Sequence, residues 1–444
     1  MSALFVAALL AATPITLEEA RSQGRQNTQA LQTLLDLTSA EQDVRYSRSA
    51  LLPQVGLNAS ASLDYVGRRK VVQTAPTIGP DGSLTFSVRE IETPSNTSDS
   101  YNLGVGLTQL IYDRARWKQL EQSGANREAA RGQAEEQADT SEMEAIRRFF
   151  SLYLSQATLD VLQANVQRSE EQLERARALF QAGRVGKSEE IAARVNLGND
   201  RISVVQRQTQ LVSDQAQLAV WLAQSGTTDL QAVAPGVLTQ EPTPAPPLES
   251  SIEAARQHRA LLRVLQQQVR SAELQRSIAN SGYVPRLSLD GRFNHGNPDP
   301  GPFVSDPGLG NTFTGSVILS WDLFNGFATD AQTKRADAQL RRVELGQAQT
   351  IRELEAEVRR AHQALDGQIA SSKLAAENRE AASQGLSLAN ERFRAGAGST
   401  LDVRDAQLKL TQAELSLLQS RIDVEIARYA LLRATGSLNS GDAR

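Results

Sequence analysis

The chain of 444 residues repeats one pattern of short segments, and this repeat constrains its fold more than any other feature. Four segments of the first half return in the second half with related residues. Because they return in the same order, we interpret the chain as a tandem duplication of one structural unit. The matched pairs are 50–55 with 282–287 (ALLPQV, GYVPRL), 109–113 with 321–325 (QLIYD, WDLFN), 180–183 with 393–396 (FQAG, FRAG) and 222–226 with 432–436 (LAQSG, LRATG).

Prolines divide the two units. No proline lies between Pro94 and Pro235, and none follows Pro307. Because proline breaks helix interiors, long helices can form in these two stretches. The Pro-rich segment 235–247 (PGVLTQEPTPAPP) is typical of an extended linker. We therefore expect a first repeat at 15–226, a linker at 227–250 and a second repeat at 251–438.

Each repeat contains two runs of alternating apolar and polar residues, the pattern of a strand with one apolar face. From Val55 to Tyr65 the odd positions are apolar and the even positions are small or polar. Similar runs occupy 101–108, 287–293 and 313–322, each roughly as long as a tilted strand that crosses a bilayer. They predict β-hairpins at 55–111 and 287–323, with long loops at 65–101 and 295–313.

Two features of the sequence favour a membrane location for these strands. No later segment is apolar enough over a sufficient length for a transmembrane helix, so any membrane span would be a β-barrel. Four strands cannot close a small barrel, which usually needs about eight, so several copies would have to share one. An ordinary sheet with one wet face is the alternative. Aromatic residues near the strand ends are typical of interfacial girdles: Tyr65, Tyr101, Tyr112, Phe313, Trp321 and Phe324.

The other segments are predicted to be helical. Apolar residues recur at spacings of three and four over 113–181 and 325–394. Each of these helices would be roughly 100 Å long, which no compact globule can hold. Shorter helices are expected at 17–52 and 188–226. The sequence thus predicts a coiled-coil bundle attached to the strands.

A strand hairpin between long helices, duplicated in tandem, resembles the TolC-like outer-membrane efflux protein family (outer membrane factors). The match rests on 17–20 (LEEA), on 50–55, and on the turns at 180–191 and 393–407. The resemblance implies a mainly α fold with a transmembrane β part. Three copies would form a homotrimer with a shared barrel of about 12 strands, continued by an α-helical periplasmic tunnel. It also implies the outer membrane of a Gram-negative bacterium, in contact with its lipid.

The resemblance further implies a passive exit duct of a tripartite efflux pump or a type I secretion system, for small molecules or proteins. Its partners would be a periplasmic adaptor (membrane fusion) protein and an inner-membrane transporter of RND, ABC or MFS type. The alternative is a periplasmic coiled-coil adaptor or scaffold without a membrane barrel. Against an adaptor, the strands lie inside two helical units. Against a scaffold, four separate runs keep their alternation.

In this family acidic rings narrow the periplasmic mouth, and the matching residues here are Asp402 and Asp405. They lie on one helix face at i, i+3, and in a trimer their crowding would raise some pKa values and attract cations. The alternative for Asp402 is helix capping, because Ser399-x-x-Asp402 fits a capping pattern. Glu189 corresponds to a further carboxylate that would pair across helices. Gly398 stands where the family has a basic partner.

Two helix-turn tips resemble the surfaces that adaptor proteins grip. The residues concerned are Phe180, Gly183 and Arg184 in the first repeat and Phe393 and Gly396 in the second. The glycines permit a left-handed turn, but an ordinary helical hairpin would need the same glycines.

The N-terminal run 1–12 is apolar, ends in small residues and is too short to span a bilayer. We interpret it as a signal peptide cleaved near Ala12, although it lacks a basic start. A disordered N-terminus is the alternative. An exported chain without cysteine must fold without disulfides.

Composition and motifs favour no catalytic, metal or cofactor site, so we expect no enzyme. The three histidines, His258, His295 and His362, are far apart. The segment 183–188 (GRVGKS) lacks the first glycine of a phosphate-binding loop. A net charge of −4 and a pI near 5.7 do not suggest nucleic acid as a partner.

Overall fold

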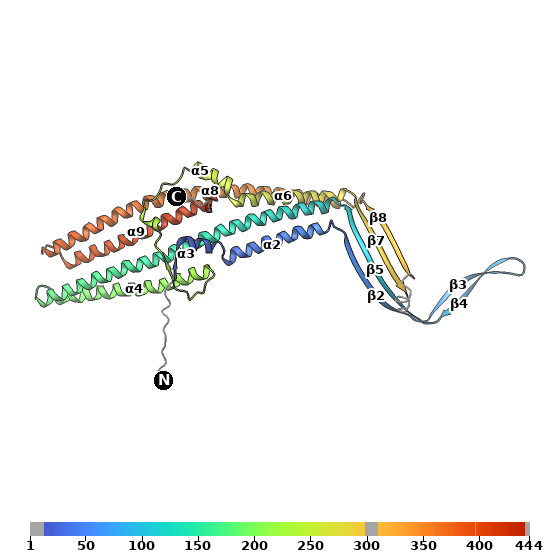
Figure 1. Cartoon of the computed structure of the whole chain (residues 1–444), viewed down its shortest axis with the longest axis horizontal. Coiled ribbons are helices and arrows are strands. Elements are labelled where there is room, and N and C mark those ends of the chain that lie inside the picture. Colours follow the sequence, from blue (N-terminus) through green and yellow to red (C-terminus); the bar gives the residue numbers. More distant parts are fainter. Residues whose placement is uncertain (1–12, 298–309, 396, 440–444) are drawn as a thin grey trace, which may run out of the picture. The chain divides into compact units, whose positions relative to one another are not determined.

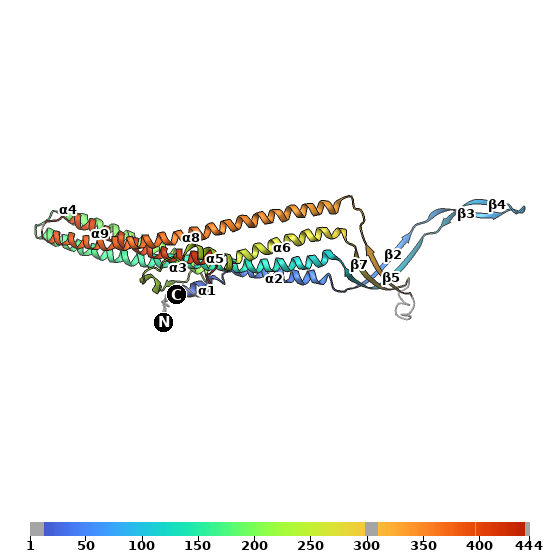
Figure 2. The ribbon, with the colours of Figure 1, turned by 90° about the horizontal axis from the view of Figure 1, so that it is seen from above.

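The computed structural model describes residues 13–297, 310–395 and 397–439. The chain forms two compact units. The first, called the helical unit, comprises Met1–Glu41, Ala125–Val269 and Arg341–Arg444, and the second, called the sheet unit, comprises Gln42–Gly124 and Arg270–Leu340. The expected signal peptide at 1–12 lies outside the described residues. Figures 1 and 2 show the elements of both units.

Two long helices occupy the stretches that lack proline, as predicted: α3 (Arg114–Gln181) and α8 (Ala328–Arg394). In the helical unit they lie beside α4 (Lys187–Trp221) and α9 (Thr400–Thr435), as both views show (Figures 1 and 2). Among the helices that the structure describes, none combines the length and the apolar character needed to cross a membrane. The remaining helices are α1 (Leu17–Gly24), α2 (Thr28–Ser49), α5 (Leu248–His258), α6 (Ala260–Asn280) and the 3-10 turns η1 (Gly236–Thr239) and η2 (Ser281–Tyr283).

The prediction of one continuous helix at 17–52 was wrong, because the structure divides it into α1 and α2. Asn27 lies between them, buried, and its side-chain oxygen accepts a hydrogen bond of 2.9 Å from the backbone N–H of Ala30. Asparagine is a preferred N-cap residue because it satisfies a free N–H group of the first turn. A similar break separates α5 from α6, where Arg259 has extended backbone.

A four-stranded antiparallel sheet forms the centre of the sheet unit, in the order β2-β5-β7-β8. The two predicted hairpins supply these strands, and the pairing of β5 with β7 joins the hairpins. Within the described residues, β2 and β8 are the two edges of this sheet. The strands are β2 (Gln54–Val66), β5 (Asn96–Tyr112), β7 (Arg286–Asn297) and β8 (Asn311–Ser320).

The prediction of a long loop at 65–101 was also wrong. This segment contains a further antiparallel pair, β3 (Arg69–Ile78) and β4 (Leu84–Thr93), which continues from β2 and β5 (Figure 1). The turn between them contains Asp81 and Gly82, and Gly82 has a φ of +80°. An Asp-Gly pair between β-prone runs is a strong hairpin signal, because glycine adopts positive φ without strain. The other expected loop, 295–313, lies largely outside the described residues.

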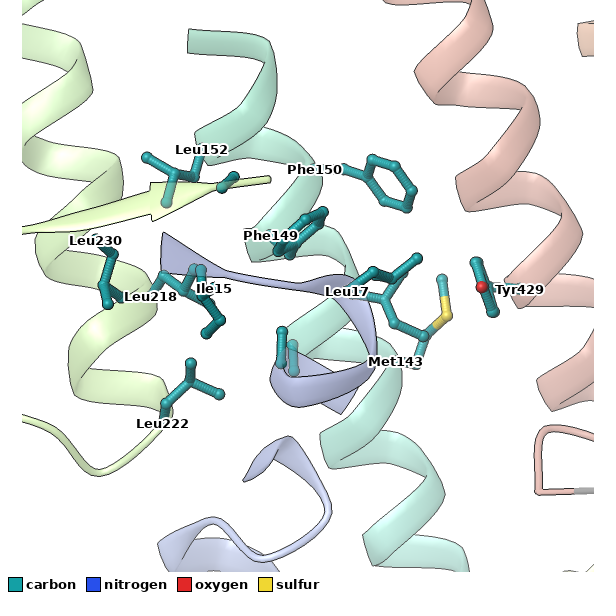
Figure 3. Close-up of a cluster of buried hydrophobic side chains, with 14 of the residues drawn as sticks. Ile15, Leu17, Met143, Phe149, Phe150, Leu152, Leu218, Leu222, Leu230 and Tyr429 are labelled. Atoms are coloured by element: carbon teal, nitrogen blue, oxygen red, sulfur yellow. The ribbon is translucent and has the colours of Figure 1, made fainter. Parts of the chain in front are cut away.

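The largest hydrophobic core lies in the helical unit and joins α1, α3, α4 and α9 (Figure 3). Phe149 and Phe150 of α3 are fully buried, and their rings meet edge to face with centroids 5.7 Å apart. A short parallel pair, β1 (Thr13–Ile15) with β6 (Leu230–Ala232), adds buried side chains from both ends of the first half. This core fixes the N-terminal segment against the long helix.

A buried cationic side chain joins the second half to α3. Arg259, 4% exposed, donates to both carboxylate oxygens of Glu136, at 2.7 and 3.0 Å, and to the backbone oxygen of Arg433 at 2.7 Å. Gly436 ends α9 in the left-handed region, and a Cβ atom there would lie 2.8 Å from the backbone nitrogen of Arg259. Only glycine therefore allows the end of α9 to approach this cluster so closely.

Replacing Phe149 tests the core. Phe149→Ala should lower the free energy of unfolding by about 3–5 kcal/mol, because it leaves a cavity among fully buried side chains. Phe149→Leu removes fewer carbon atoms and should cost less. Denaturant unfolding of the purified full-length chain, followed by circular dichroism, measures both. Equal losses for the two variants would contradict the packing described here.

Candidate functional site

Two helix-turn tips lie at the same end of the helical unit (Figure 1). One joins α3 to α4 at 182–186, and the other joins α8 to α9 at 395–399. The described candidate site residues lie on these tips or in the helix turns that flank them, and Asp405 lies in the second turn of α9.

The first tip ends α3 with a left-handed glycine. Gly183 has a φ of +71°, and the N–H groups of Gly183 and Arg184 donate to the carbonyls of Phe180 and Leu179, both at 2.9 Å. This bonding pattern satisfies the last carbonyls of a helix. Lys187 places its ammonium 4.8 Å from the centroid of the Phe180 ring. Arg184 is exposed at the end of the tip.

The second tip also follows a phenylalanine in the last turn of a long helix. Phe393 is half-buried in the last turn of α8, and the N–H of Ala397 donates to Arg392 at 2.9 Å. Gly396 lies outside the described residues. A Cβ atom on Gly398 would lie 3.2 Å from the backbone nitrogen of Phe393. This short distance gives a physical reason for glycine at the position where the family resemblance would place a basic side chain.

Asp402 takes part in a capping box at the start of α9. Its carboxylate accepts hydrogen bonds of 2.9 Å from the backbone N–H and the hydroxyl of Ser399, whose side chain accepts from the N–H of Asp402. These two donors lower the pKa of the Asp402 carboxyl below its usual value. Within one chain the capping alternative therefore describes the contacts of Asp402. The rise in pKa expected from crowding stays a prediction for assembled copies.

Asp405 and Glu189 have different partners. Asp405 is exposed and forms an ion pair of 2.6 Å with Lys409, one turn further along α9. Glu189, in the first turn of α4, accepts a hydrogen bond from the hydroxyl of Thr400 at the start of α9. The structure thus brings Glu189 to α9, whereas Asp402 contacts the N-cap residue of α9 and Asp405 contacts Lys409 within α9.

A charged contact that was not predicted from the sequence connects α3, α4 and α9. Arg404 donates to both carboxylate oxygens of Asp200, at 2.9 and 3.0 Å, and to the hydroxyl of Ser169 at 3.1 Å. The side chains of Arg404 and Asp200 are only 14% and 10% exposed. A usable signal was present, since Asp200 follows the apolar Leu197 at helical spacing and so lies on the inner face of α4.

Next to this ion pair lies a groove of about 610 Å³ between α3, α4 and α9. Glu189, Thr400 and Arg404 line it, together with small side chains such as Ala192 and Ala193. The groove and its polar contacts place both repeats in direct contact close to the tips.

A second buried carboxylate stabilises the first tip. Glu190 is buried and contacts three cations, Lys187, Arg194 at 2.9 Å and Arg177 at 3.7 Å. The hydrogen bond from Lys187 is the main cause that lowers the pKa of Glu190. The sequence analysis predicted a functional role for the neighbouring Glu189 and none for Glu190.

Comparison with known proteins decides the family. The sequence profile of the outer membrane efflux protein family matches residues 15–224 and 251–437. The chain belongs to the outer membrane efflux protein family. The outer membrane protein TolC of Vibrio cholerae serotype O1 is 23% identical over 432 residues, which cover 96% of this chain and 92% of the relative. Outer membrane efflux protein BepC of Brucella suis is 33% identical over 141 residues, 31% of this chain and 30% of the relative.

Solved channels share the fold. The CmeC outer membrane channel of Campylobacter jejuni superposes with a TM-score of 0.78 at 15% identity, over 95% of this chain and 86% of that chain. The outer membrane protein VceC of Vibrio cholerae superposes with a TM-score of 0.74 at 16% identity, over 95% and 96%. The fold is thus that of channels with a helical tunnel and a β-barrel, as the resemblance implied.

Family membership gives the class of function and the location. This outer membrane efflux protein is a channel-tunnel of the Gram-negative outer membrane with a periplasmic helical part. Channels of the family are trimers that work with adaptors and inner-membrane pumps, and the family is one of transport proteins. The alternative of an adaptor or scaffold without a membrane barrel has no support from these comparisons.

The contact between Arg404 and Asp200 can be tested by a double-mutant cycle. Arg404→Met and Asp200→Leu should each lower the free energy of unfolding by about 3 kcal/mol, because each leaves a partly buried charge without its partner. The double variant should lose less than the two single losses added together. The matched control is the exposed pair Asp405→Leu with Lys409→Met, whose coupling should stay below about 0.5 kcal/mol. Equal coupling at the two pairs would contradict the role assigned to Arg404.

Proposed function

We propose that three copies of this chain form the exit duct of a tripartite export system. The observation that carries the proposal is the four-stranded sheet, which has two edges without a further strand in the described part of the chain, because four strands are too few to close a barrel. Pairing β2 of one copy with β8 of the next gives a closed barrel of about 12 strands, in which every strand edge is satisfied. The apolar odd positions of β2 then face lipid, and its polar even positions face a wet lumen.

We further propose that this duct arose as a tandem duplication, with repeats at 15–226 and 251–438 joined by the linker 227–250. The order of elements supports it, since each half has two shorter helices, two central strands, a long helix and a final helix. The linker contains β6 and η1 and belongs to the helical unit. The run 1–12 would be the signal peptide that directs export.

The proposed constriction lies at the tips of the helical unit. Asp402 and Asp405 of three copies would form acidic rings, and Glu189 would hold the start of α4 to the start of α9 through Thr400. Support comes from the exposure of both aspartates and from the ionised state that Ser399 favours at Asp402. Rings of carboxylates attract cations and repel anions at close range.

The tips themselves would contact a periplasmic adaptor. The proposed contact surface combines aromatic, basic and glycine residues. These are Phe180, Gly183 and Arg184 at the first tip and Phe393 and Gly396 at the second. An inner-membrane transporter of RND, ABC or MFS type would supply the energy. The duct itself would carry small molecules or proteins passively, so it would have no catalytic residues, no cofactor and no enzymatic activity.

The direct test is the single-channel conductance of the purified full-length protein in a planar bilayer, with its mass measured in parallel. We expect a trimer that gives small, cation-preferring conductance steps. A monodisperse monomer that never inserts into the bilayer would contradict the shared barrel.

The acidic constriction makes a separate prediction. Asp402→Asn combined with Asp405→Asn should reduce the preference for cations, because the variant lacks both carboxylates that would form the acidic rings. Ser399→Ala removes the hydroxyl that donates to Asp402 and leaves the backbone N–H, so it takes away part of what lowers the pKa of Asp402. The carboxyl then protonates at somewhat higher pH, and cation preference is lost at higher pH than in the wild type. Reversal potentials across a salt gradient, measured from neutral to acidic pH, report both effects. Unchanged selectivity in the double variant would refute the constriction.

A further inference from the structure

The hairpin β3–β4 continues the ladder of β2 and β5 without a change of register. In both ladders the partner number falls by one as the strand number rises by one, from Gln54 opposite Thr108 to Ile78 opposite Leu84. Only two positions on each strand interrupt the pairing, at 67–68 and 94–95. Because side chains alternate between faces, the even-numbered residues of both strands follow one face along the whole ribbon.

The polarity of this face reverses along the ribbon. In β2 and β5 the even face is polar, and Ser62 and Ser100 share a hydrogen bond of 2.7 Å across it. Beyond the interruption the even face becomes apolar towards the turn, where Pro76 lies opposite Phe86 and Ile78 opposite Leu84. We call Pro76, Ile78, Leu84, Phe86 and Val88 the apolar tip face.

The odd face reverses in the opposite sense. In β2 the odd face is apolar, and in the proposed barrel it faces lipid. In β3 and β4 it is mainly polar, and the hydroxyls of Thr77 and Ser87 lie 3.1 Å apart on it. The odd face of the hairpin is therefore suited to water, as expected where the ribbon leaves the membrane. The even face is then the one that needs a cover.

None of the residues that the structure describes covers the apolar tip face of its own copy. Phe86 and Val88 are each 70% exposed and Ile78 is 73% exposed. A two-stranded hairpin alone is only marginally stable in water, and a contiguous apolar surface on such a ribbon marks an interaction site. An exposed ion pair, Lys70 with Glu90 at 3.5 Å, lies on the same ribbon between this surface and the interruption.

We propose that the apolar tip faces of three copies pack against one another and reversibly close the outward mouth of the channel with a hydrophobic constriction. The proposal rests on the shared barrel proposed above. In that barrel the even face of β2 and β5 points to the lumen, and the unbroken register carries the same face into the hairpin. Threefold symmetry then brings identical faces together on the axis. A narrow apolar constriction can stop ion flow by excluding water.

Single cysteines test the proposal cleanly because the chain has none of its own. Phe86→Cys and Leu84→Cys lie on the apolar tip face, and the matched control Ser87→Cys lies on the opposite face of the same strand. Each full-length variant is purified as the wild type is, its mass is measured, and it is treated with a short thiol cross-linker. Phe86→Cys and Leu84→Cys should give covalent dimers joining two of the three copies. Ser87→Cys should stay monomeric on a denaturing gel.

The outcomes separate this proposal from the function on which it rests. If the variants are trimeric and conduct ions but cross-link no better than Ser87→Cys, the hydrophobic closure is refuted and the duct stands. Monomeric particles would refute both. Quenching of a fluorophore on Phe86→Cys by brominated lipid would identify the membrane as the cover and refute packing between copies. Cross-linked Phe86→Cys should also lose conductance and regain it when the cross-link is cleaved.

Discussion

The two edge strands, β2 and β8, set the condition on which the rest of this molecule depends. Each presents a row of backbone N–H and C=O groups along its outer side, and hydrocarbon offers these groups no partner. A single chain cannot meet this condition, because its sheet has too few strands to curl onto itself. Further copies can meet it, and the helices then have to surround a common axis as well. The helical tunnel is in this sense a consequence of a sheet that closes only when several copies pair their edge strands.

Much of the architecture follows from the sequence, because it depends on local periodicity. Alternation from Val55 to Tyr65 predicted β2, and spacings of three and four without proline predicted α3 and α8. The duplicated segments predicted that both halves contribute strands. These signals are robust because each depends on the spacing of apolar residues within one element, which shows the face that the element buries.

What the sequence did not reveal depends on contacts between distant elements or on a weak local signal. The division of α1 from α2 depends on the buried cap at Asn27, and the pair Asp200–Arg404 depends on how three helices meet. Asp402 matched an acidic ring, with a capping box as the alternative, and only its bonds to Ser399 show which contact one chain makes. The hairpin β3–β4 was missed because its apolar face is the opposite one to that of β2, although Asp81-Gly82 marked its turn.

The pairing of β5 with β7 has a consequence for the route by which the chain folds. Tyr101 lies opposite Asn297, and all of α3, α4, α5 and α6 separate the two residues in sequence. Closing so long a loop costs entropy, and non-local strand pairing is slow compared with local hairpins and helices. The hairpins β2–β5 and β7–β8 can therefore form early and independently. Their union must wait until the intervening helices have brought their ends together, which leaves a window in which the strand edges are exposed to aggregation.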